Sequence, residues 1–154
     1  MDVDEHGFAS VQQLTRALQK RGWANLEPEE LITRLQSPDV ERFQLVGDRV
    51  RARYGHSIEI TYDFPRAEVR DPLYHGTSRS AWNSIRKQGL KPLGRSHVHL
   101  SRNSQEAGRV GRRHDAKPVI IEVNVPEDHQ PNWLDAGPVI LADHVPPSWL
   151  TRWN

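Results

Sequence analysis

The sequence predicts an α+β protein with an N-terminal winged-helix-like lobe, incomplete in this chain, and a mainly β second lobe. Two observations lead to this prediction. Two helix-forming segments are followed by a hairpin signal in the first third of the chain. Short, β-branched runs then dominate the second half. The 154 residues leave room for one domain or for two small lobes.

The first lobe is predicted to begin with a helix capped by Ser10, because Val11, Leu14 and Leu18 then share one helical face and Gly22 follows as a stop signal. This helix supplies the first apolar surface of the lobe.

A second helix is predicted from Pro28 to Ser37, followed by the strands Phe43–Val46 and Arg49–Arg53 with Gly47-Asp48 as the hairpin turn. Helix, helix and hairpin together favour a winged-helix-like lobe, a fold that often binds nucleic acid. The alternative interpretation is a small α+β cap, since fold analogy alone is a weak warrant for function.

The lobe boundary is predicted in Phe64–Pro72, which carries two prolines and mixed charge, so that the lobes cover residues 1–64 and 65–154. The five tryptophans are interpreted as packing residues, with Trp149 and Trp153 capping the second lobe. The elements predicted in that lobe are the strand Leu73–His75 ending at Gly76, the helix Ser80–Gln88 closed by Gly89, the strand His97–Ser101, a helix from Asn103 to about Arg113, and the strands Val119–Val125 and Val139–Leu141.

Charge and composition narrow the functional classes. The net charge of +1 excludes a non-specific nucleic-acid coat but leaves room for a local basic site, and basic residues gather in Arg49–Arg53, Arg86–Arg95 and Arg102–His114. The absence of cysteine excludes disulfides and thiolate zinc sites. No apolar run is long enough for a membrane span and no signal peptide is recognisable, so we expect a cytoplasmic protein without a membrane partner.

The first chemical motif is Leu73–Thr77, where a histidine at a strand end is followed by glycine and a hydroxyl. This order brings the backbone close to a bound group and places two polar side chains beside it. The alternative interpretation is an ordinary strand-to-turn connection with a satisfied histidine. Further along, His97 and His99 resemble part of a metal site, but no third ligand has suitable spacing, and we predict no metal.

Taken together, three blocks of the sequence resemble the NAD⁺-dependent RNA 2′-phosphotransferase (tRNA 2′-phosphotransferase) family. The order and spacing of the blocks match over nearly the whole chain, from about Val3 onward. The blocks are Val50-Arg51-Ala52 with Gly55-His56-Ser57; Leu73-Tyr74-His75-Gly76-Thr77 with Ile85, Gly89-Leu90, Arg95 and His97-Val98-His99-Leu100-Ser101; and Val110-Gly111-Arg112-Arg113-His114.

The resemblance implies that the second lobe is ADP-ribosyltransferase-like and that the chain consumes NAD⁺. In the implied reaction, an internal RNA 2′-phosphate attacks C1″ of NAD⁺ and expels nicotinamide, giving a 2′-phospho-ADP-ribosylated RNA. The ribose O2″ then attacks phosphorus, and ADP-ribose 1″,2″-cyclic phosphate and RNA with a free 2′-OH are released. The implied partners are NAD⁺ and a tRNA-like RNA carrying a 2′-phosphate, as in tRNA splicing, and we expect a monomer.

The resemblance also implies roles for individual residues. Arg51 and Arg113 match catalytic arginines, and a phosphate dianion requires donors that stay protonated. Val139 would stand where many protein ADP-ribosyltransferases have Glu, a carboxylate that would repel the phosphate; by residue type alone it is a core residue. The implied NAD⁺-binding residues are His75, Gly76, Thr77, Arg95, His99, Ser101 and Val139, and those that contact RNA or brace the lobe interface are Arg53, His56, Ser57 and His114.

One part of the family's catalytic set has no match: an adjacent Arg and His on a helix upstream of the block that Val3–Leu14 resembles. We expect that the start of the chain is misplaced or shortened. Three alternatives stay open, namely a short form that is slow in the second step, an ADP-ribosyltransferase acting on terminal phosphates of nucleic acid or on protein, and a non-catalytic NAD⁺- or RNA-binding module.

Overall fold

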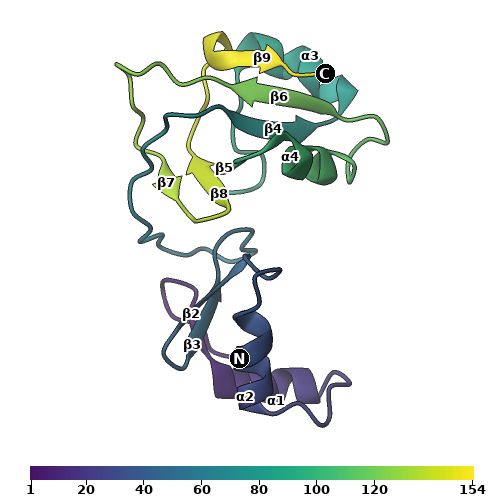
Figure 1. Ribbon diagram of the computed structural model, residues 1–154, viewed down its shortest axis with the longest axis vertical. Coiled ribbons are helices and arrows are strands. Elements are labelled where there is room, and N and C mark those ends of the chain that lie inside the picture. The colour runs from purple at the N-terminus through teal and green to yellow at the C-terminus, as the bar shows by residue number, and fades with distance from the viewer. The chain divides into compact units, whose positions relative to one another are not determined.

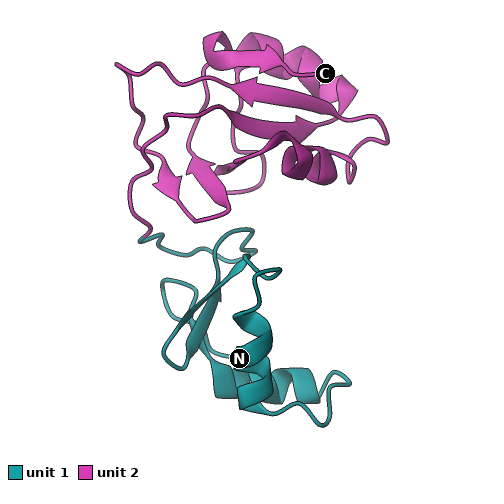
Figure 2. Ribbon diagram, in the orientation of Figure 1, with its two compact units in different colours: residues 1–63 teal, residues 64–154 magenta.

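A computed structural model describes residues 1–154, which form two compact units, Met1–Asp63 and Phe64–Asn154 (Figure 2). The boundary between them lies one residue before the predicted one. The structure is therefore described unit by unit. Its helices and antiparallel sheets confirm the α+β class.

Unit 1 contains the two predicted helices, α1 (Val11–Gln19) and α2 (Pro28–Leu35) (Figure 1). Ser10 caps α1, because its Oγ accepts a hydrogen bond from Gln13 N at 3.0 Å. Pro28 occupies the first turn of α2, where its missing N–H has no intrahelical role. The helices pack on a small apolar core, which contains Val11, Leu26, Leu31 and Val50.

A three-stranded antiparallel sheet completes unit 1, in the order β1-β3-β2. The predicted hairpin is confirmed as β2 (Phe43–Val46) and β3 (Arg49–Ala52), with Gly47 at a φ of +59° in the turn. The second strand ends one residue earlier than predicted. The strand β1 (Ala9–Ser10) was not predicted, because two residues directly before a helix show no alternation.

Unit 2 is built on a six-stranded antiparallel sheet in the order β7-β8-β5-β4-β6-β9. The long pairing joins β4 to β6 at five positions, from Leu73↔Val123 to Thr77↔Val119. The strands are β4 (Leu73–Thr77), β5 (Val98–Ser101), β6 (Val119–Val123), β7 (Leu134–Asp135), β8 (Val139–Ala142) and β9 (Leu150–Arg152).

Two helices cover opposite faces of this sheet (Figure 1). The helix α4 (Ser104–Gly111), capped by Asn103, lies against the face that carries Gly76. The helix α3 (Arg79–Gln88), capped by Ser78, packs on the other face, and Gly89 ends it at a φ of +83°. The sequence predicted that α4 continues to about Arg113, whereas it ends at Gly111.

The main core lies on the α3 face of the sheet. Trp133 is the largest fully buried side chain, and Trp149 contacts it edge-on at 5.9 Å between ring centroids. Trp23 and Trp153 are more exposed, at 51% and 52%, and the ring of Trp153 contacts Tyr74 edge-on at 5.4 Å between ring centroids. The buried apolar members of the core are Ala67, Val69, Leu73, Leu90, Val98, Leu100, Val119, Ile121, Val123, Trp133, Ile140, Ala142 and Val145.

Candidate functional site

The Leu73–Thr77 motif forms strand β4, and its glycine is required by α4. A Cβ atom built on Gly76 would lie 1.8 Å from the carbonyl oxygen of Ala107 and 2.8 Å from the backbone nitrogen of Gly111. Any side chain at this position would therefore push α4 off the sheet. The motif was expected to bring the backbone close to a bound group, whereas at Gly76 the close neighbour is the backbone of α4.

His75 is half-buried, and its Nδ1 lies 3.0 Å from the carbonyl oxygen of His99. Because a carbonyl oxygen only accepts, Nδ1 carries the hydrogen and Nε2 of the neutral ring is an acceptor. Burial lowers the pKa of His75, the hydrogen bond to His99 opposes this, and the charge of His114 lowers the pKa further. The imidazole is consequently neutral at pH 7.

The strands β4 and β5 pair at a single position, Tyr74↔Ser101. The strands β4 and β6 share five residue pairs, so the junction between β4 and β5 has far fewer pairs than its neighbour in the middle of the sheet. The hydrogen bond from His75 to the His99 carbonyl crosses this junction. A ligand that inserts between β4 and β5 has few ladder bonds to replace.

The remaining NAD⁺-binding candidates divide between the two faces of the sheet. Side chains alternate along a strand, so the pairs Tyr74↔Ser101 and Ser101↔Val139 place His99, Ser101 and Val139 on the α4 face. Thr77 and His75 lie on the α3 face, opposite Val119 and Ile121. Arg95, which is exposed, donates from Nη1 to Nδ1 of His99 at 3.4 Å.

Arg113 and His114 follow the end of α4, and both side chains are exposed. Their backbone N–H groups donate to the carbonyl oxygens of Val110 and Gly111 at 3.1 and 2.9 Å. A Cβ atom built on Gly111, in the third sequence block, would lie 3.2 Å from the Cα atom of Gly76, so the structure brings this block up to β4.

In unit 1, Arg51 on β3 is the one buried charged residue of the chain, with 5% of its surface exposed. Its Nε donates to Oε1 of Gln44 at 2.7 Å, and its Nη1 donates to Oδ1 of Asp63 at 2.5 Å and to the carbonyl oxygen of His6 at 3.2 Å. The guanidinium also stacks 4.4 Å from the ring centroid of Phe8. These contacts fix the guanidinium in one orientation.

The other three candidates of unit 1 lie on the segment after β3. The half-buried His56 contacts Tyr62 edge-on, with 3.3 Å between Nδ1 and the Tyr62 hydroxyl, and its buried Nε2 has no hydrogen-bond partner. Burial and the charge of Arg51 lower the pKa of His56. Arg53 is half-buried, with its backbone N–H bonded to the Arg42 carbonyl, and Ser57 is exposed.

Sequence reasoning missed the residues that hold the Arg51 guanidinium. Asp63, Gln44 and Phe8 surround the Arg51 guanidinium, although they lie far from one another in the chain. No local pattern announces such contacts. Asp115, directly after the third block, offered a signal, because it is a carboxylate next to a run of cations.

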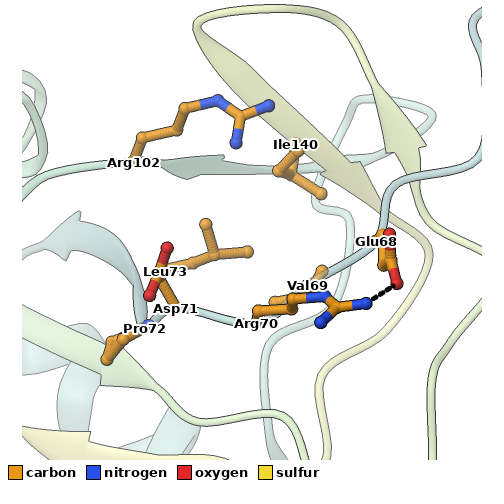
Figure 3. Close-up of a pocket in the computed structure, with 8 residues that line it drawn as sticks. All are labelled: Glu68, Val69, Arg70, Asp71, Pro72, Leu73, Arg102 and Ile140. Carbon is orange, nitrogen blue, oxygen red and sulfur yellow. Dashed lines mark hydrogen bonds and ion pairs between the residues drawn. The ribbon is translucent and has the colours of Figure 1, made fainter. Parts of the chain in front are cut away.

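One pocket of unit 2 lies close to the candidate residues without containing them (Figure 3). Its volume is about 280 Å³. Arg102 and Ile140, which both line it, directly follow Ser101 and Val139 in the chain. The lining residues are Glu68, Val69, Arg70, Asp71, Pro72, Leu73, Arg102 and Ile140.

Two classes of feature do not occur in the structure. No group of three or more His, Cys, Asp or Glu side chains is arranged to hold a metal ion. None of the helices combines the length and the apolar character that crossing a bilayer requires.

Comparison with known proteins identifies the relatives of this chain. A family model described as "RNA 2′-phosphotransferase, Tpt1 / KptA family" matches residues 1–137. Three curated relatives, named "Probable RNA 2′-phosphotransferase" or, for the third, "Probable RNA 2′-phosphotransferase 2", are each 36% identical to this chain. They come from Bacillus thuringiensis subsp. konkukian, Streptomyces griseus subsp. griseus and Archaeoglobus fulgidus. The alignments cover 97%, 97% and 96% of this chain and 83%, 85% and 69% of the respective relatives.

Proposed function

Because the chain belongs to the RNA 2′-phosphotransferase, Tpt1 / KptA family, we propose that it removes an internal 2′-phosphate from RNA by transferring the phosphate to NAD⁺. In this proposal, unit 2 is the ADP-ribosyltransferase-like lobe that binds NAD⁺. Unit 1 is the winged-helix-like lobe that binds RNA, with Arg53, His56 and Ser57 as contacts.

The observation that carries the NAD⁺ part of the proposal is the tautomer of His75. The bond from Nδ1 to the His99 carbonyl leaves Nε2 as an acceptor on a neutral ring. A ribose hydroxyl is a matching donor. The single pair between β4 and β5 gives a nicotinamide riboside a place to insert beside this ring. Thr77 and Ser101, both 8% exposed, supply further buried hydroxyl groups on the two strands.

The chemistry proposed is a pair of displacements. A 2′-phosphate oxygen forms a bond to C1″ as the bond from C1″ to the nicotinamide nitrogen breaks. The ribose O2″ then forms a bond to phosphorus as the bond from phosphorus to the RNA 2′-oxygen breaks, and the proton of O2″ passes to the RNA. The first step brings a dianion to the site, and the second concentrates charge on the phosphoryl oxygens. Permanently protonated arginines suit both steps.

Arg113 is the candidate donor for this charge in unit 2, because it is exposed, makes no ion pair, and directly precedes His114. We propose that Arg113 and Arg51 contact the phosphate, with His114 as a further RNA contact. Val139 is consistent with this proposal, since a buried apolar side chain beside Ser101 presents no negative charge to the phosphate.

The test uses RNA with one internal, radiolabelled 2′-phosphate, incubated with NAD⁺ and the full chain. We expect the label to leave the RNA as ADP-ribose 1″,2″-cyclic phosphate, with one nicotinamide released per phosphate. RNA with only a terminal phosphate serves as the second substrate. Label that stays on the internal position while the terminal phosphate becomes ADP-ribosylated would replace the proposal with the alternative acceptor.

Neighbouring arginines provide a matched pair of variants. Arg113→Ala should lower kcat by a factor that corresponds to a loss of about 2–4 kcal/mol in transition-state stabilisation. Arg112→Ala, which removes an equally exposed cation one position earlier, should leave kcat nearly unchanged. Equal losses in the two variants would show a general effect of charge and would remove Arg113 from its role.

A further inference from the structure

Asp115 directly follows Arg113 and His114, and its carboxylate is among the most heavily hydrogen-bonded in the protein. Its Oδ2 accepts from the backbone nitrogen and the Nε of Arg79 at 3.1 and 3.0 Å. Its Oδ1 accepts from Nη2 of Arg79 at 3.1 Å and from the backbone nitrogen of Lys117 at 3.0 Å. The Asp115 side chain is 14% exposed, although it lies on a loop.

These bonds join two parts of unit 2 that carry candidate residues. Arg79 is the first residue of α3 and comes two positions after Thr77, the last residue of β4. Asp115 therefore ties the loop after α4 to the turn between β4 and α3. Behind it, the backbone nitrogen of Asp115 is bonded to the carbonyl oxygen of Gly111 at 3.0 Å, so the intervening loop is held at both ends.

The cation that Asp115 neutralises is Arg79. Residues 72–114 contain nine Lys or Arg and one carboxylate, Glu106, so Asp115 borders a strongly cationic stretch. Asp115 pairs with Arg79 through both carboxylate oxygens, and Arg113 makes no ion pair, so the donors of Arg113 stay available to an anion.

We propose that Asp115 is a positioning residue that, through Arg79 and Lys117 N, fixes Arg113 and His114 beside β4 for the incoming RNA phosphate. The inference rests on the proposed function and extends it. It states that a carboxylate that does not touch the substrate sets the geometry of the loop that carries Arg113 and His114. Asp115 and Arg79 both act through Arg113 and His114.

The kinetic test is a double-mutant cycle in the full chain. Asp115→Ala should lower kcat for 2′-phosphorylated RNA by roughly ten- to a hundred-fold, since small displacements of a phosphate donor have effects of this size. Arg79→Ala should have a smaller effect, because the bonds from Arg79 N and Lys117 N remain. In an Arg113→Ala background, Asp115→Ala should cause little further loss. Losses that multiply would overturn the proposal.

The matched control is Glu106→Ala, which removes an ion pair within the neighbouring helix α4, the Glu106–Arg109 contact at 3.0 Å. We expect unchanged turnover for this variant. If Asp115→Ala does not fold, Asp115→Asn takes its place. The amide oxygen still accepts from Lys117 N, but the amide group faces the donors of Arg79, so turnover should fall in this variant too.

A second measurement does not depend on turnover. His114 lowers the pKa of His75, so an NMR titration of His75 reports whether His114 stays in place. In Asp115→Ala the pKa of His75 should rise towards its ordinary value, and in Glu106→Ala it should not change. An unchanged His75 titration in Asp115→Ala overturns the positioning role. If the unmodified chain leaves the RNA phosphate in place, the proposed function fails and the titration alone decides the role of Asp115.

Discussion

The contact between Gly76 and α4 gives the sharpest test of how unit 2 is packed. A Cβ atom at Gly76 would lie 1.8 Å from the carbonyl oxygen of Ala107, whereas an ordinary carbon–oxygen contact is about 3.3 Å. Gly76→Ala must therefore move α4 by about 1.5 Å. The obstructing atoms belong to the backbone of a helix and do not rotate away. We expect a loss of about 3 kcal/mol or more in the free energy of unfolding of unit 2.

A glycine of α4 itself supplies the control. In Gly108→Ala, the new Cβ atom would lie 3.3 Å from Cδ1 of Ile120, the flexible end of a side chain. Alanine is also favoured over glycine inside a helix by about 1 kcal/mol. Gly108→Ala should therefore be neutral or slightly stabilising, although it lies on the same helix and faces the same sheet.

The assay is urea unfolding without NAD⁺, followed by tryptophan fluorescence. Trp23 is the single tryptophan of unit 1, so a Trp23→Phe background restricts the signal to unit 2. If Gly76→Ala unfolds within about 0.5 kcal/mol of the parent chain, α4 does not lie on β4 as described, and the account of the motif is refuted.

Three further predictions concern single residues. His75→Ala should weaken NAD⁺ binding in calorimetry, whereas His97→Ala, which changes a half-buried neighbour bonded to Ser96, should not; equal affinities would refute the role of His75. Arg51→Ala should destabilise unit 1 by about 2–3 kcal/mol, seen as earlier unfolding at Trp23, because the Gln44 and His6 acceptors lose their donor. The hydrogen bonds from Arg79 hold the pKa of Asp115 well below its usual range, so its stabilising contribution is complete above the unfolded-state pKa and is lost as the pH falls through the folded-state pKa. Acid unfolding below about pH 4 should therefore depend less on pH in Asp115→Asn than in the parent chain.

Local signals in the sequence predicted most elements because each one depends on neighbouring residues. Ser10 and Asn103 cap the helices they were assigned, and Gly47 and Gly89 take the positive φ values that their turns require. The strands that were missed, β1, β7 and β9, are two or three residues long. Such strands form because a longer neighbour offers them a ladder, as β6 does for β9, and no periodicity of their own announces them.

The site was predicted as a set of residue types, and the structure adds which group each one contacts. The motif around Gly76 indicated close backbone approach, but only the fold shows that α4 is the neighbour. Arg51 was expected as an available phosphate donor, yet Asp63, Gln44 and the His6 carbonyl already hold it. Contacts of this kind join residues that lie up to 45 positions apart. Such contacts form only when the chain has folded, so no short segment of the sequence predicts them.

The two arginines therefore place different demands on the substrate. Arg113 is exposed and unpaired with any carboxylate, so an anion reaches it without displacing a protein group. Arg51 is buried, and its partner Asp63 has a side chain that is 45% exposed. A phosphate that engages Nη1 of Arg51 competes with this carboxylate, which is itself an anion that a guanidinium binds. Asp63→Asn should then strengthen binding of RNA phosphate, whereas Asp115→Asn should weaken it, and a binding assay on both variants separates a competing carboxylate from a positioning one.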